Sequence, residues 1–123
     1  MKKCPSAVIV AKPGPLRSSL HSLMSTISQV EDVVELNDTS TLFEICSETK
    51  PELVFLDGNL PNDKIWKSIS QMVHYWPQIN TIVFVDDKDQ QKRAEESGAN
   101  IVLRKGFPAS KLTKTVENLL SSQ

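Results

Sequence analysis

One carboxylate of this chain lies where parallel sheets carry their chemistry. Asp57 directly follows the apolar run 53–56, and the segment 58–63 behind it is rich in Gly, Pro and Asn. Four consecutive apolar residues between Pro51 and Gly58 predict a strand covered on both faces, as in a parallel sheet flanked by helices. Ligands bind at the carboxyl ends of such strands, so Asp57 is a candidate binding or catalytic residue. The alternative is that Asp57 is only a turn or cap residue.

The composition limits the kinds of protein to which this carboxylate can belong. The 123 residues are 39% hydrophobic, which predicts one domain over residues 1–123. Because 14 basic and 15 acidic residues give a net charge of −1, no field of one sign would attract nucleic acid or an anionic membrane. We find no signal peptide and no apolar run of about 18 residues, so we expect a cytoplasmic protein. Cys4 and Cys46 lack metal-ligand spacing, and we expect inert thiols.

Apolar runs and amphipathic stretches alternate along the chain. The expected strands cover residues 6–11, 33–36, 53–56, 81–85 and 101–103. Four of the five segments that follow them carry apolar stripes at helical spacing. The segment 87–97 has Ala94 as its only apolar residue, which predicts a short, solvated helix that Gly98 closes. This alternation predicts an α/β fold, a doubly wound parallel (βα)₅ sheet with right-handed crossovers.

Taken together, these residues resemble the receiver domain of bacterial response regulators over essentially the whole chain. Asp57 matches the phosphoacceptor aspartate and 58–63 the loop behind it, while Gly98 followed by Lys105 and Phe107 matches the segment with the family's lysine. The resemblance implies a flavodoxin-like sheet with strand order 2-1-3-4-5. It also implies phosphoryl transfer from a histidine kinase to the aspartate, with Mg²⁺ holding the phosphoryl oxygens and the lysine pairing with the product.

The chain departs from the family's pattern at the metal site. The family carries an adjacent acidic pair after its first strand, and those positions align with Ala11 and Lys12. Asp57, Lys12 and Lys105 sum to a formal charge of +1, whereas a family site sums to −2. Like charges about 4 Å apart repel by about 4 kcal/mol at an effective dielectric constant of about 20. We therefore expect no metal ligands and no cofactor, and a pair between Asp57 and Lys12, Lys105 or both, unless Lys12 points to solvent.

Two switching positions depart from the family as well. The family places Thr or Ser at the end of the fourth strand and an aromatic residue in the fifth, where this chain has Asp86 and Val102. An aspartate would repel a phosphoaspartate, and valine cannot alternate between buried and exposed rotamers, so we expect the coupling from site to surface to be lost. As an alternative, Asp63, Asp86 or Asp87 could serve as a substitute metal ligand.

These features leave two functional hypotheses. The first is an atypical receiver, a signalling and protein-interaction module without enzymatic activity that is independent of Mg²⁺-dependent phosphorylation. The second is a functional receiver that binds Mg²⁺ and accepts phosphate on Asp57 from a histidine kinase. Expected partners are a histidine kinase or another signalling protein, contacted around 88–96 and 111–117. Binding to nucleic acid or membrane is not expected, while a homodimer, or an output domain after Gln123, is left open.

Overall fold

The structure is a parallel sheet between two layers of helices. A computed structural model describes residues 5–46, 49–60 and 64–121. The strands are β1 (Ala7–Val10), β2 (Val33–Leu36), β3 (Leu53–Asp57), β4 (Asn80–Val85) and β5 (Ile101–Arg104). They pair in parallel in the order β2-β1-β3-β4-β5. The predicted flavodoxin-like fold and its strand order are confirmed.

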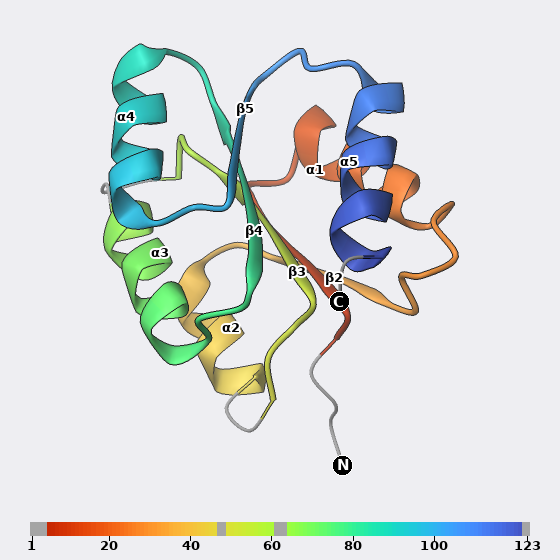
Figure 1. The fold of residues 1–123 in the computed structure, drawn as a ribbon, viewed down its shortest axis with the longest axis horizontal. Helices are drawn as coiled ribbons and strands as arrows, with labels where there is room; N and C mark the ends of the chain where they lie inside the picture. The colour runs from red at the N-terminus through yellow and green to blue at the C-terminus, as the bar shows by residue number, and fades with distance from the viewer. Residues whose placement is uncertain (1–4, 47–48, 61–63, 122–123) are drawn as a thin grey trace.

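The helices cover both faces of this sheet (Figure 1). Helices α1 (Pro15–Met24) and α5 (Ala109–Ser121) lie on one face, and α2 (Thr39–Ile45), α3 (Lys64–Tyr75) and α4 (Lys88–Ser97) lie on the other. Strand β3 shows why its sequence does not alternate. Leu53 and Phe55 pack into the core under α1 and α5, while Val54 and Leu56 pack into the core under α2, α3 and α4. Both faces of the strand are therefore buried.

Helix α4 is longer than its polar sequence predicts, and it is capped at both ends. It runs for ten residues, the same length as α1, although Ala94 is its one buried residue. Asp87 caps its first turn by accepting a hydrogen bond from the Gln90 N–H, and Gly98 ends it with φ 100°. The predicted Gly98 cap is confirmed, whereas the expectation of a short helix is wrong. Good caps at both ends stabilise a helix that has little apolar surface to bury.

The cysteine expectation is also corrected. Cys46 follows α2, is buried, and is disulfide-bonded. The expectation of an inert free thiol is therefore wrong for Cys46, and Cys4 lies outside the described residues. Sequence spacing gave no sign of this bond, because two cysteines in 123 residues have neither the density nor the regular spacing of a disulfide scaffold.

Candidate functional site

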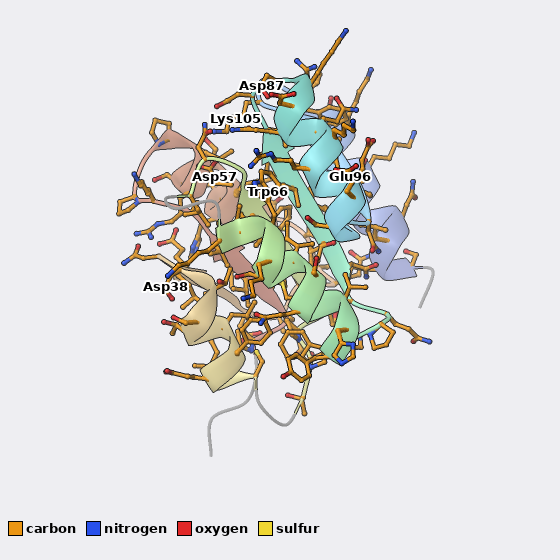
Figure 2. All side chains as sticks on the ribbon, turned by 90° about the vertical axis from the view of Figure 1, so that its left-hand side faces the viewer. Asp38, Asp57, Trp66, Asp87, Glu96 and Lys105 are labelled. Atoms are coloured by element: carbon orange, nitrogen blue, oxygen red, sulfur yellow. The ribbon has the colours of Figure 1, made fainter. Side chains whose placement is uncertain are left out.

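Three charged side chains from different strands meet at the carboxyl edge of the sheet. Asp57 is the last residue of β3, Asp86 follows β4, and Lys105 follows β5. Since the strands are parallel, their carboxyl ends share one edge, and Figure 2 shows Asp57 and Lys105 near one another there. The side chain of Asp57 is 15% exposed, so its carboxylate is partly withdrawn from water. This edge is the candidate site.

Lys105 joins the two carboxylates. Its Nζ lies 2.9 Å from Asp57 Oδ1 and 3.4 Å from Asp86 Oδ1. The backbone N–H of Lys105 donates to the Val85 carbonyl at 3.0 Å, which fixes the start of the lysine side chain beside the end of β4. The expected pair with Asp57 is thus present, and Lys105 makes it. Lys12 is exposed and, within the described residues, forms no ion pair with Asp57.

Asn59 and Gln90 complete the site, and the sequence analysis did not single out either. The Asn59 N–H donates to Asp57 Oδ1 at 2.9 Å, and its side-chain Nδ2 donates to Asp86 Oδ2. Gln90 Nε2 donates to Asn59 Oδ1 at 2.6 Å, and Gln90 Oε1 accepts from the Asp86 N–H at 2.8 Å. The available signals were the position of Asn59 two residues after the candidate aspartate and that of Gln90 in the first turn of a helix beginning at the same edge.

The hydrogen bond from Asn59 lowers the pKa of the Asp86 carboxyl, and the charge of Lys105 lowers it further. Both interactions stabilise the ionised carboxylate. Asp86 is also 42% exposed, so water screens its pairing with Lys105. Asp86 is therefore held as a carboxylate that accepts hydrogen bonds from both sides.

The loop after β1 carries positive charge where the family resemblance implies acids. Ala11 is buried, and its carbonyl accepts a hydrogen bond at 3.1 Å from Arg17 Nη1, a residue that the sequence analysis did not single out. Arg17 also donates to Asn37 Oδ1 at 2.7 Å and lies 3.6 Å from Glu35. The guanidinium is thus fixed against this loop, and Lys12 adds a second cation nearby.

The side chains at this edge do not fit a Mg²⁺ site of the family's type. Mg²⁺ is held by carboxylate and water oxygens, whereas the two carboxylates here share Lys105. Among the described residues, no group of three or more His, Cys, Asp or Glu side chains could hold a metal ion. Of the candidate substitute ligands, Asp87 caps α4 at 2.9 Å from the Gln90 N–H, and Asp63 lies outside the described residues.

Val102, at the position of the family's aromatic residue, is part of the sheet. It lies opposite Val83 on β4 and packs, partly buried, against the core under α2, α3 and α4. A side chain with two methyl groups on Cβ and no ring has no second, exposed position to occupy. That β5 does not report on the site through Val102 stays a prediction.

Gly58 lets the loop after β3 pass close to β4. Its N–H donates to the Phe84 carbonyl at 2.8 Å, and a Cβ at Gly58 would lie 2.9 Å from that oxygen and 3.2 Å from Gln90 Oε1. We expect Gly58→Ala to lower the free energy of unfolding by about 1–3 kcal/mol in urea titrations, because backbone must move. Gly14→Ser is the control, since a Cβ there meets nothing within 4 Å. If Gly58→Ala leaves the free energy of unfolding unchanged, the backbone of β4 can shift to admit the methyl group without loss of stability.

Comparison with known proteins identifies the family. The family model described as "Response regulator receiver domain" matches residues 8–117. This chain belongs to that family. The receiver domain is a module of two-component signalling. Solved receiver domains have a similar fold. The receiver domain of NtrX from Brucella abortus superposes with a TM-score of 0.80 at 18% sequence identity, over 95% of this chain and 99% of that one. The receiver domain of an HD domain-containing protein from Pseudomonas fluorescens Pf-5 superposes with a TM-score of 0.82 at 16% identity, over 99% of this chain and 90% of that one.

A curated relative gives a similar result at the level of sequence. The "Uncharacterized transcriptional regulatory protein YhcZ" of Bacillus subtilis (strain 168) is 28% identical over 102 residues, which cover 81% of this receiver domain and 48% of YhcZ. The chain therefore spans about half the length of this relative. Within the described ranges, no helix has both the length and the apolar character needed to cross a bilayer.

Proposed function

We propose that this receiver is an atypical one, a protein-interaction module in two-component signalling whose binding surface does not depend on Mg²⁺-dependent phosphorylation. The observation that carries the proposal is that the Asp57 carboxylate is already paired and hydrogen-bonded. Its Oδ1 lies 2.9 Å from both Lys105 Nζ and Asn59 N, so the carboxylate already has a cation and a backbone donor. Lys12 stands on the neighbouring loop at one position of the family's acidic pair, and Arg17, in the first turn of α1, donates to the Ala11 carbonyl of that loop.

The charge distribution gives the physical reason. Phosphoryl transfer depends on positioning and on neutralising the charge that develops on the phosphoryl oxygens, which in receivers is the task that the resemblance assigns to Mg²⁺. In this domain Lys105 would have to supply that neutralisation, and it is shared between Asp57 and Asp86. A phosphoryl group on Asp57 would also face the negative charge of Asp86. We therefore assign no catalytic role to Asp86 at the family's Thr or Ser position, and no cofactor to the domain.

The alternative is a functional receiver that accepts phosphate on Asp57 from a histidine kinase. It is favoured by one observation, that Asp57 and Lys105 occupy the family's acceptor and lysine positions with their charged atoms in contact. Under this alternative Asp86 would act as a metal ligand, and Mg²⁺ would have to displace Lys105 from the Asp86 carboxylate.

The proposed partner is a histidine kinase or another signalling protein, or a second copy of the domain. The proposed contact surface includes the exposed polar side chains of α4, from Lys88 to Glu96, and those of α5 from Lys111 to Glu117. A net charge of −1 provides no electrostatic attraction to nucleic acid or to an anionic membrane. Such a module would work in the cytoplasm, without enzymatic activity of its own.

Intact-mass spectrometry after incubation with acetyl phosphate and Mg²⁺ tests the proposal. We expect the mass of the domain to remain unchanged, as for an Asp57→Asn variant. A receiver that retains its acidic pair, treated in the same tube, controls for the activity of the phosphodonor. An added phosphoryl group that is absent from Asp57→Asn would overturn the proposal and establish the alternative.

A further inference from the structure

Gln90 connects three separate segments of the chain. It lies in the first turn of α4, and its backbone N–H donates to Asp87 Oδ1 at 2.9 Å. Its side chain reaches both the end of β4, at the Asp86 N–H, and the loop after β3, at Asn59 Oδ1. Gly58 leaves room for this side chain, because a Cβ there would lie 3.2 Å from Gln90 Oε1. One amide therefore joins β3, β4 and α4 at the candidate site.

The donors and acceptors around Gln90 can be arranged in only one way. A backbone N–H can only donate, so the Gln90 atom that faces Asp86 N must be the oxygen, and Nε2 then faces Asn59. The Asn59 atom that accepts from Nε2 must be Oδ1, which leaves Nδ2 for the Asp86 carboxylate. The three residues form a closed ring of three hydrogen bonds. A substitution that removes either half of an amide opens this ring.

Asn59 links the ring to the Asp57 carboxylate. The Asn59 N–H donates to Asp57 Oδ1, and Lys105 contacts both Asp57 and Asp86. Helix α4 depends on these contacts more than an amphipathic helix would, because Ala94 is its one buried side chain. A change in the charge of Asp57 must alter its interactions with the Asn59 N–H and the Lys105 ammonium. Asn59 is a member of the hydrogen-bonded ring that holds the first turn of α4, and Lys105 contacts Asp86 in the same ring.

We propose that Gln90 is a positioning residue through which the Asp57–Lys105 pair holds the first turn of α4 in place. The link runs through Asn59 and Asp86, so it does not use the Thr or Ser and aromatic positions that this chain lacks. It replaces our expectation that every connection from the site to this surface is lost. The inference does not rest on the proposed function, because the link holds whether or not Asp57 accepts phosphate.

Hydrogen exchange of the α4 amides tests the role of Gln90. We expect Gln90→Ala to speed exchange across the first half of α4 about tenfold, as the loss of two side-chain hydrogen bonds allows, while exchange in α5 stays the same. Gln91→Ala is the matched control, since it removes the same side chain one position along the helix. The Gln91 side chain forms no hydrogen bond with any residue that the structure describes. Alanine favours helix at both positions, so both variants should fold.

A double-mutant cycle separates positioning from a merely local effect. Asp57→Asn, which removes the charge and keeps the shape, should speed α4 exchange at least about threefold when Gln90 is present and should add nothing in the Gln90→Ala background. Two results would overturn the inference: equal effects of Asp57→Asn in both backgrounds, or exchange in Gln90→Ala that matches Gln91→Ala. Neither result depends on a phosphodonor, so the failure of this inference is distinct from a failure of the proposed function.

Discussion

Changing both Ala11 and Lys12 to aspartate is expected to tighten Mg²⁺ binding by at least about 100-fold. The double change makes the loop after β1 more negative by three charge units, one from Ala11 and two from Lys12. Each unit placed about 4 Å from a bound charge alters the interaction by about 4 kcal/mol at an effective dielectric constant of about 20, and about 2.8 kcal/mol already corresponds to a factor of about 100. Isothermal titration calorimetry with MgCl₂ measures the change directly.

The burial of Ala11 adds a second measurable result. A carboxylate at this buried position costs stability unless a cation pairs with it. The double variant should therefore unfold at a lower temperature than the unmodified domain, and Mg²⁺ should restore part of the loss by mass action. Lys114→Glu with Ser121→Glu makes the same change of charge on α5 and should show neither effect. If the Ala11 and Lys12 variant binds Mg²⁺ no better than this control, the alignment of these two residues with the acidic pair is wrong.

The sequence was sufficient to predict the fold because the apolar pattern and the topology determine each other. A run such as 53–56, apolar at every position, requires a strand buried on both faces, and the helices supply that cover. Parallel connection then places Asp57, Asp86 and Lys105 at one edge regardless of their distance in the chain. The residue types at the strand ends therefore predicted that Lys12, Lys105 or both pair with Asp57, and the structure shows the pair with Lys105.

The sequence did not reveal the hydrogen bonds that complete the site. Asn59 and Gln90 are 31 positions apart and have no apolar or charged pattern to mark them. Whether an exposed amide faces water or a neighbouring loop depends on the direction of its side chain, which periodicity does not encode. The same holds for Lys12 and Arg17. Lys12 was long enough to reach Asp57, yet the cation that is fixed against the loop after β1 is Arg17.

Replacing Lys105 by methionine is expected to lower the free energy of unfolding by about 1–3 kcal/mol at pH 7. The lysine is 29% exposed and contacts two carboxylates, so the pair lies between an exposed ion pair, worth at most about 1 kcal/mol, and a buried one, whose disruption costs about 3–5 kcal/mol. Methionine retains most of the apolar stem, and the loss therefore reports on the charge. Urea unfolding of both proteins provides the measurement, with Lys111→Met on α5 as the control.

The loss of stability in Lys105→Met should depend on pH. In the folded protein the hydrogen bond from Asn59 and the charge of Lys105 hold the pKa of Asp86 below the 3.8 of an unperturbed aspartate. A lowered folded-state pKa stabilises the fold above the unfolded value, and this stabilisation is lost as the pH falls through the folded value. The difference between the unmodified domain and Lys105→Met should therefore be largest near pH 7 and should shrink below about pH 4, as Asp86 becomes protonated.

A second substitution distinguishes charge compensation from packing. In Asp57→Asn with Lys105→Met, no ionised Asp57 is left without its cation, so the double variant should be more stable at pH 7 than Lys105→Met alone. The introduced asparagine side chain keeps an oxygen that can accept from the Asn59 N–H, so the local turn is retained. If Lys105→Met loses the same free energy well below pH 4 as at pH 7, and Asp57→Asn recovers none of it, then Lys105 stabilises this edge through its aliphatic stem and not by balancing the two carboxylates.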